Sequence, residues 1–476
     1  MIVPGCGFNG KLRQRILPRI YPAILVLALL SCVTRMPAAS QADRSCQAAD
    51  QPSFLQCASE ARQGGIDRII INGTIDCGRN LACGGILIGI NRSFEVTGGT
   101  ADAGFSRAAE NHASFGISIR NSSGPIVVRG LKFNMARRAP RGQPGAIWVD
   151  PDCPTPDDCP QEAIGIIHSN NVLVDRIQVL DAPRFGISIF DSYSITIRRS
   201  LFVRSGLHGI WVAAQPASRG LHVENNQFID IRSNGAMLSV LPPDATDPLG
   251  ENTVTGNVFD HNHNAAVYHV CGPTGHDPCA GGQLDIERHS ARFLIADNDF
   301  RHGVMDEDPS LARDFRVTGI EIAPLEVQDI VIRHNYFHDL SSGAITSDSP
   351  IAARALRVLD NAFGRLGTGV AEINHAELVA ENRGNHSDST GDQWRRPAGS
   401  LSWTPCRPDD GQKCAAVIRW ESDIRDMSLR LILNGSHLFA KSAPARGERV
   451  FELPRSQPTR LDLYAGGTLL DTIEIP

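Results

Sequence analysis

Side chains that can transfer protons or balance charge gather in one irregular part of the chain, between residues 260 and 325. Its members are His269, Asp285, Glu287, Arg288 and Glu321. Carboxyl and imidazole groups act as general acids and bases, and a guanidinium group stabilises negative charge. They can act together only where the fold brings them to one surface, so the elements that position them decide whether this is a site.

A repeated pattern of apolar residues, Asn and Phe organises the middle of the chain. In LHVENNQF (Leu221–Phe228), alternating apolar residues are followed by polar residues, an Asn, one spacer and a Phe. The Asn recurs as Asn226, Asn257, Asn298, Asn335 and Asn361. Three copies upstream, beginning at Ile126, Val172 and Ile195, replace the Asn. Internal repetition of this kind predicts a solenoid, in which each repeat forms one coil.

A second signature in each repeat is a Gly followed by alternating apolar residues. Examples are FGISI (Phe185–Ile189), HGIWV (His208–Val212) and TGIEI (Thr318–Ile322). Such alternation predicts short strands, and three strands per repeat predict three parallel sheets around an apolar core. Asn amides at equal register can then form a ladder of hydrogen bonds. A β-sandwich is disfavoured, because it would show hairpin turns and no fixed register.

The combination Gly-Ile-x-Ile and Ile-x-Ile-x-x-Asn-x-Phe resembles the right-handed parallel β-helix of the pectin-lyase-like superfamily. The resemblance covers roughly residues 66–390 and implies an all-β, three-sided helix of about ten coils. It also implies that the Gly-led strands line a groove for an extended polysaccharide. It does not specify an activity, since this fold hosts lyases, hydrolases, epimerases and binding proteins. The Asp-Pro-His-Asp run of mannuronan C5-epimerases and the paired aspartates of polygalacturonases are missing.

The N-terminus has the layout of an export signal. Basic residues precede the apolar run Ala23–Leu30, and small residues follow it. We predict a signal peptide at 1–42, with a lipoprotein signal ending at 31 and lipid on Cys32 as the alternative. The protein is then periplasmic, extracellular or an outer-membrane lipoprotein.

The remaining chain divides into four further segments. We predict an N-terminal cap at 43–65, the β-helix at 66–390, a linker at 391–400, and a small antiparallel β-sandwich-like domain at 401–476. The repeat pattern ends after Arg383. We predict that the last domain caps the open end of the helix, because an exposed solenoid end invites pairing; the alternatives are carbohydrate binding and a spacer role.

Ten cysteines beyond the signal fall into close pairs, which predicts local disulfides formed in an oxidising compartment. The pairs are Cys46/Cys57, Cys77/Cys83, Cys153/Cys159, Cys271/Cys279 and Cys406/Cys414. None forms a CxxC motif, which argues against zinc binding.

Residues at equal register on stacked coils are neighbours about 4.8 Å apart. Under the resemblance, the groove has aromatic and polar parts. We predict substrate-binding roles for Phe190, Trp211, Tyr268 and Asp285, and catalytic roles for His269, Glu287, Arg288 and Glu321. The register is ambiguous here, because either AAVYHV (Ala265–Val270) or QLDIE (Gln283–Glu287) can be the groove strand. Asp306 and Asp308 are candidate Ca²⁺ ligands.

Two reactions fit these groups. β-Elimination from a uronic acid, or epimerisation of the uronic acid, needs a neutraliser for the carboxylate and a base, for which Tyr268, His269 and Arg288 are candidates. Hydrolysis needs two carboxyl groups, for which Glu287 and Glu321 are candidates. We predict an exported, monomeric lyase or epimerase for an acidic polysaccharide; the alternative is a non-catalytic glycan-binding or scaffold protein. The net charge of −6 argues against nucleic-acid binding.

Overall fold

The computed structural model describes residues 44–475. The ranges excluded from the description are 78–83, 107–115, 136–161, 214–217, 232, 246, 248, 263–278, 287–289, 304–314, 323–326, 348–349, 368–371, 405–412, 424–428, 435–436, 455–458 and 466. Among the described residues, no helix is both long and apolar enough to span a bilayer.

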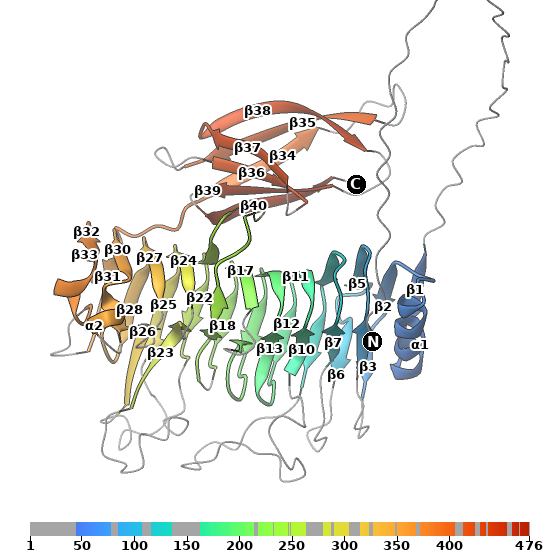
Figure 1. Ribbon diagram of the computed structural model, residues 1–476, viewed down its shortest axis with the longest axis horizontal. Helices are drawn as coiled ribbons and strands as arrows, with labels where there is room; N and C mark the ends of the chain where they lie inside the picture. The colour runs from blue at the N-terminus through green and yellow to red at the C-terminus, as the bar shows by residue number, and fades with distance from the viewer. Residues whose placement is uncertain are drawn as a thin grey trace, which may run out of the picture. The chain divides into compact units, whose positions relative to one another are not determined.

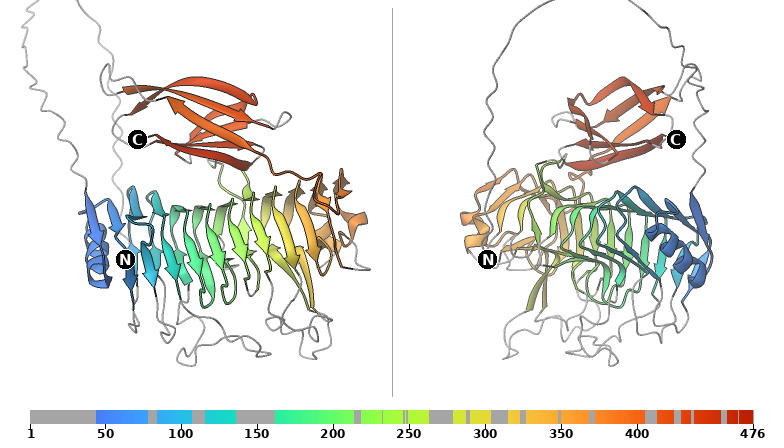
Figure 2. Two further views of the ribbon diagram at one scale, coloured as in Figure 1. Left: turned by 180° about the vertical axis from the view of Figure 1, so that it is seen from behind. Right: turned by 45° about the vertical axis from the view of Figure 1, so that its right-hand side comes forward.

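Residues 45–387 form a parallel β-helix with three sheets, here called A, B and C (Figure 1). From Gly85 to Phe363 the described strands follow the order C, A, B along the chain, with one additional strand in sheet A, and the strands before and after this range belong to sheets A and B. The coils lie in sequence order along each sheet (Figure 2).

Sheet A contains β1 (Ser45–Ala48), β2 (Arg68–Ile71), β5 (Phe94–Gly98), β8 (Ile126–Arg129), β11 (Asn170–Asp175), β14 (Tyr193–Arg198), β17 (Ser218–Glu224), β20 (Val240–Leu241), β21 (Asn252–Thr255), β24 (Ala291–Ala296), β27 (Gln328–Arg333), β30 (Leu356–Leu359) and β32 (Glu381–Arg383). Sheet B contains β3 (Thr74–Asp76), β6 (Gly104–Ser106), β9 (Lys132–Asn134), β12 (Gln178–Leu180), β15 (Leu201–Val203), β18 (Gln227–Ile229), β22 (Val258–Asp260), β25 (Asp299–Gly303), β28 (Tyr336–Leu340), β31 (Ala362–Phe363) and β33 (His386–Ser387). Sheet C contains β4 (Gly85–Ile88), β7 (Ile117–Arg120), β10 (Glu162–Ile167), β13 (Phe185–Phe190), β16 (Ile210–Val212), β19 (Ala236–Leu238), β23 (Cys279–Ile286), β26 (Phe315–Ile322) and β29 (Ile345–Ser347). A short helix, α2 (Pro350–Ala353), and a 3₁₀ turn, η1 (Ala376–Leu378), lie between later strands.

The Asn residues form the predicted ladder at the turn from sheet A to sheet B. Asn298 accepts from the backbone N–H of Asn257 at 2.9 Å, and its amide nitrogen donates to the carbonyl oxygen of Val254 at 2.8 Å. The same two bonds join each Asn to the coil before it. The amides are buried, so the ladder satisfies polar groups that water cannot reach.

The ladder extends one coil beyond the predicted end of the repeat. Asn385 accepts from the backbone N–H of Asn361 at 2.9 Å, and β32 and β33 complete that coil. The coil pattern therefore continues past Arg383, where the sequence repeat was predicted to end, and stays within the predicted β-helix of 66–390. The coil was missed because Ser387 replaces the expected Phe in register with Phe363.

The Phe residues and the Gly residues of the repeat have one joint explanation. Phe202, Phe228, Phe259, Phe300 and Phe337 stack with ring centroids 4.7–5.1 Å apart. A Cβ atom on Gly209 would lie 2.7 Å from the ring of Phe228, and one on Gly319 would lie 2.5 Å from that of Phe337. The Gly is needed because each ring packs directly against the start of a sheet C strand.

The N-terminal end of the solenoid is covered by a helix. α1 (Gln51–Arg62) begins after the N-cap Asp50, whose side chain accepts from the backbone N–H of Ser53. Phe54 is buried against Phe105, and the disulfide Cys46–Cys57 ties α1 to β1. That predicted pairing is confirmed.

The other cysteine predictions are described only in part. Cys77 is disulfide-bonded. Cys83, Cys153, Cys159, Cys271 and Cys406 lie outside the described residues, as do the side chains of Cys279 and Cys414.

The C-terminal domain consists of two antiparallel sheets. One contains β34 (Gly399–Thr404), β35 (Lys413–Ser422) and β38 (Arg446–Pro454); the other contains β36 (Leu429–Leu433), β37 (His437–Ala443), β39 (Thr459–Ala465) and β40 (Thr468–Ile475). Leu401, Ile418, Leu431 and Leu463 belong to the core between them.

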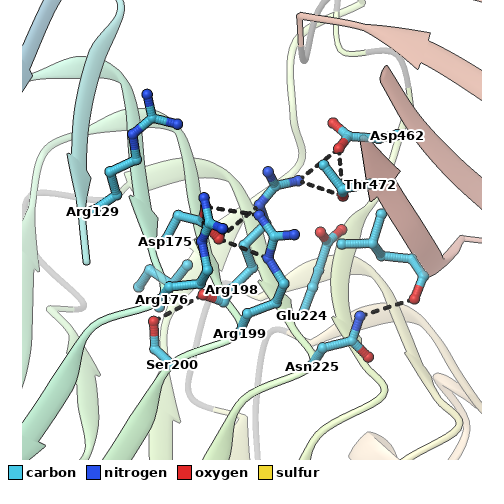
Figure 3. A network of polar contacts seen from close by, with 12 residues as sticks. Arg129, Asp175, Arg176, Arg198, Arg199, Ser200, Glu224, Asn225, Asp462 and Thr472 are labelled. Carbon is cyan, nitrogen blue, oxygen red and sulfur yellow. Dashed lines mark hydrogen bonds and ion pairs between the residues drawn. The ribbon is translucent and has the colours of Figure 1, made fainter. Parts of the chain in front are cut away.

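This domain contacts the outward face of sheet A through buried charges (Figure 3). Arg198 donates from Nη1 to Asp462 Oδ1 at 2.8 Å, and its Nε lies 3.3 Å from Asp175 Oδ1. All three side chains are buried. The Tyr464 hydroxyl donates to Glu224 Oε2 at 3.2 Å. The predicted role of capping the end of the helix is therefore wrong: these contacts lie on mid-helix coils.

Candidate functional site

A column of outward-facing side chains on sheet C joins an aromatic part to an acidic part. The strand register pairs each member with the next, and we call the column the sheet C strip. It consists of Ser188, Trp211, Met237, Asp285, Glu321 and Thr346. Ile187, Ile189 and their counterparts point inward and are buried, so strand alternation holds the strip outward.

Aromatic side chains surround one end of the strip. The ring of Trp211 stacks on Phe185 with centroids 4.6 Å apart, and Phe190 meets it edge-on at 5.0 Å. The Arg184 guanidinium lies over Phe185 at 4.8 Å from the ring centroid. Phe190 and Trp211 are only half-buried. This arrangement provides a fixed aromatic surface of the kind that lines ligand sites.

The other end of the strip carries two carboxyl groups. Asp285 in β23 and Glu321 in β26 are direct partners in the parallel register, and both are half-buried. Side chains at equal register stand roughly one strand spacing apart, about 4.8 Å. Two carboxyl groups this close can share a proton, hold a cation, or act as acid and nucleophile.

The structure describes one of the two alternative strands. Residues 283–286 of QLDIE belong to β23 in sheet C, whereas Glu287 and AAVYHV lie outside the described residues. Of the predicted site residues, the strip brings together Trp211, Asp285 and Glu321, with Phe190 beside Trp211. The others lie outside the described residues and stay predictions: Tyr268, His269, Glu287, Arg288, Asp306 and Asp308.

The sequence interpretation assigned no site role to three residues beside the aromatic end: Arg184, Phe185 and His208. His208 is buried, and its ring stacks on Phe185 with centroids 5.7 Å apart. The signal was present, because FGISI and HGIWV align in register and place His208 one residue before Gly209. The same alignment places Phe185 one residue before Gly186.

A second polar cluster was also missed, and it lies on sheet B. Asp260, His261 and His302 converge at the corner after β22 and β25, beside Arg301 and His338. Burial alone would raise the pKa of Asp260, but hydrogen bonds from His302 and His261 and the charge of Arg301 hold it below the usual range. For His338, burial lowers the pKa, and Asp299 and Asp339 outweigh it and raise the pKa above the usual value.

Further perturbed groups lie at the contact with the C-terminal domain. Burial raises the pKa of Glu224. Burial would lower the pKa of Arg198, yet Asp462 and Asp175 raise it above the usual value. Perturbed pKa values can mark active sites, but structural ion pairs perturb them too. Here the partners come from both domains and are buried, so this cluster is an interface.

Comparisons with known proteins agree with the architecture. A family described as "Right handed beta helix region" matches residues 152–277. No curated protein matches the chain. The match and the sheet topology confirm the predicted fold, a right-handed parallel β-helix.

Solved structures with similar folds are distant in sequence. ORF18 of Geobacillus virus E2 is 10% identical with a TM-score of 0.42, covering 82% of this chain and 70% of that one. A pectate lyase from Paenibacillus sp. 0602 is 10% identical with a TM-score of 0.38, covering 69% and 79%. The A-module of the Azotobacter vinelandii mannuronan C-5 epimerase AlgE4 is 12% identical with a TM-score of 0.36, covering 69% and 88%. These likenesses concern the fold and assign no activity.

Proposed function

We propose that this protein is a carbohydrate-active enzyme that binds a polysaccharide along the sheet C strip and cleaves it beside Asp285 and Glu321. The observation that carries the proposal is the register of the strip, which aligns Trp211, Met237, Asp285 and Glu321 on successive coils. Trp211 and Glu321 are three strand spacings apart, about 14 Å. That length can accommodate several sugar units, which the aromatic residues would bind at one end and the carboxyl groups would cleave at the other.

The described carboxyl pair favours hydrolysis as the reaction. A double displacement uses two carboxyl groups about 5–5.5 Å apart, close to the strand spacing that separates Asp285 from Glu321. One group protonates the leaving oxygen, and the other attacks the anomeric carbon. The sequence alone favours elimination or epimerisation and offers Glu287 and Glu321 as the carboxyl pair for hydrolysis; here the partner of Glu321 in the register is Asp285.

Elimination or epimerisation of an acidic polysaccharide is the second candidate. Asp285 and Glu321 would repel a uronate unless a cation lay between them, and two carboxylates are suitable ligands for Ca²⁺. When bound, Ca²⁺ would neutralise the uronate carboxylate and acidify the C5 proton. The base remains the predicted Tyr268, His269 or Arg288.

The test is a product screen on neutral glucans, polyuronates and bacterial exopolysaccharides. New reducing ends without unsaturation indicate hydrolysis, unsaturated ends indicate elimination, and deuterium uptake at C5 indicates epimerisation. A chelator should abolish elimination or epimerisation if that reaction requires Ca²⁺. Binding of a polymer that stays intact after long incubation would instead favour the non-catalytic alternative.

Two variants connect the activity to the strip. Asp285→Asn and Glu321→Gln should each lower turnover about 100-fold or more. Asp329→Asn is the matched control, because this exposed carboxylate on sheet A forms an ion pair with Arg357, away from the strip, and should leave turnover unchanged. Wild-type turnover in both strip variants would contradict the site assignment.

Trp211 is expected to act in binding. Trp211→Ala should weaken polysaccharide affinity about tenfold, since it removes a large aromatic contact without touching the carboxyl groups. The check is a titration with the polymer identified in the screen. Affinity equal to wild type would exclude Trp211 from the binding surface.

We also infer that the protein is exported. The disulfide Cys46–Cys57 and the disulfide-bonded Cys77 support an oxidising compartment. The mass of the mature N-terminus distinguishes cleavage after Ala42 from lipidation of Cys32.

A further inference from the structure

Three side chains that can bind a metal ion lie close together on adjacent coils, at the end of β22 and in the neighbouring strand β25. His261 Nδ1 lies 2.5 Å from Asp260 Oδ1, and His302 Nδ1 lies 2.8 Å from the same oxygen. The three atoms lie within 4.8 Å of one another, and the two imidazole rings are 4.8 Å apart. We call Asp260, His261 and His302 the corner triad.

The corner triad differs from the other His–Asp pairs at similar corners. His168 Nδ1 lies 2.9 Å from Asp191 Oδ2, and His334 Nδ1 lies 2.6 Å from Asp297 Oδ1. Those histidines, like His261 and His302, have positive φ. Each of those pairs contributes one imidazole to one carboxylate. In the corner triad, imidazoles from two coils converge on one carboxylate oxygen.

Two described neighbours of the corner triad, Arg301 and His338, are hydrogen-bonded to carboxylates. Arg301 Nε donates to Asp260 Oδ2 at 3.1 Å, which orients the carboxylate so that Oδ1 faces the two imidazoles. The adjacent His338 hydrogen-bonds through both nitrogens, to Asp299 and to Asp339. The side chains of His261 and His302 are 37% and 42% exposed, so an ion from solution can reach them.

We propose that the corner triad binds a divalent transition-metal ion, such as Zn²⁺, through His261 Nδ1, His302 Nδ1 and Asp260 Oδ1. Imidazole and carboxylate are suitable zinc ligands. Ligand atoms of a tetrahedral zinc site lie about 3.4 Å apart, so the triad needs to open by less than about 1 Å for its shortest contact. Three protein ligands leave a fourth position for water or another ligand.

Such an ion would tie two neighbouring coils together. β22 and β25 are the sheet B strands that precede β23 and β26, which carry Asp285 and Glu321. The ion would therefore fix the spacing of the coils from which the acidic strands begin. This inference does not depend on the activity proposed for the strip.

The test is calorimetric titration of chelator-treated, tag-free protein with ZnCl₂, together with its thermal unfolding. The expected result is one zinc ion per chain, a higher unfolding temperature with zinc, and no displacement by excess Ca²⁺, because imidazole ligands disfavour it. His261→Asn and His302→Asn should each weaken binding at least about tenfold. Asn tolerates positive φ and can still donate to Asp260, so these variants should remain folded.

His168→Asn is the matched control, since it removes an imidazole from a similar corner that has only one. It should bind zinc as the wild type does. The proposal is overturned if the wild type binds no zinc, if both corner variants bind it unchanged, or if His168→Asn weakens binding as much as they do. Circular dichroism of each variant without metal separates loss of binding from loss of fold.

Discussion

Two outward faces of the same solenoid handle charge in opposite ways. On sheet A, Arg198, Asp175 and Asp462 are buried at the contact with the C-terminal domain and paired with one another. On sheet C, Asp285 and Glu321 are only half-buried and sit beside each other with like charge. The backbone register is the same on both faces, so the difference comes from what covers the side chains.

The comparison concerns how burial changes what a charge contributes to stability. A buried charge must be matched within the protein, because leaving it unpaired costs several kcal/mol. On a partly open surface, solvent screens the charges of Asp285 and Glu321, so their interactions contribute less to folding.

The largest stability effect is expected on the sheet A face. Arg198→Met leaves Asp175 and Asp462 buried with less compensation and should lower the free energy of unfolding by about 3–5 kcal/mol. Arg419→Met, in the exposed pair with Glu448, should cost less than about 1 kcal/mol. Denaturant unfolding of both variants measures the difference, and equal effects would contradict the comparison.

The next effect concerns the scaffold beneath both faces. Asn298→Ala removes the side chain that bonds to Asn257, Val254 and Asn335. We expect a loss of about 3 kcal/mol in the free energy of unfolding, since buried backbone groups lose their partners. Gln227→Ala, an exposed position on sheet B, should change it by less than about 0.5 kcal/mol. A small effect for Asn298→Ala would mean that the ladder is dispensable.

A smaller effect is expected from pH on the sheet A face. Burial lowers the pKa of His222, but the hydrogen bond and charge of Asp247 outweigh it, so the net pKa is raised above 6.5. A raised histidine pKa stabilises the fold below about pH 6.5, and this stabilisation is lost as the pH rises through the folded value. The unfolding free energy should therefore fall from pH 6 to pH 9.

Asp247 does not contribute to that change. Burial would raise its pKa, but the hydrogen bond and charge of His222 lower it, so its stabilisation is lost only on acidification below about pH 4. In His222→Asn the slope between pH 6 and pH 9 should be shallower than in wild type. An unchanged slope would mean that another group titrates there.

The smallest stability effect is expected on the sheet C strip. Asp285→Asn and Glu321→Gln should change the free energy of unfolding by no more than about 0.5 kcal/mol, because each removes one of two neighbouring like charges. A loss of 2 kcal/mol or more in the free energy of unfolding, measured by thermal or denaturant unfolding, would show that these residues stabilise the fold as Arg198 does.

The repeat pattern predicted the scaffold well, because its residues act through register. Asn226 to Asn361 lie on the ladder, and Phe202 to Phe337 form the ring stack. The outward positions Trp211 and Glu321 followed from strand alternation. Asp285 was named, but its pairing with Glu321 needed the register of β23, which the sequence left ambiguous.

Other features depended on contacts that the pattern does not encode. The pairing of Arg198 with Asp462 joins two domains, so no local spacing reveals it. The corner triad was within reach, since NVFDH (Asn257–His261) and NDFRH (Asn298–His302) align on their Asn and Phe residues. The repeat pattern ends at the Phe, so it does not include the two residues that follow.

The Asn ladder has a direction. Each Asn closes the coil before it: its oxygen accepts from the backbone of that coil, and its nitrogen donates to a carbonyl oxygen there, as Asn257 does with Asn226 and Val223. The same nitrogen also donates to the side-chain oxygen of the Asn that follows, as Asn257 does to Asn298. A coil is therefore closed only when the Asn of the following coil arrives. A chain that folds from its N-terminus would therefore add one coil at a time, and each new coil would complete the hydrogen bonds of the coil before it.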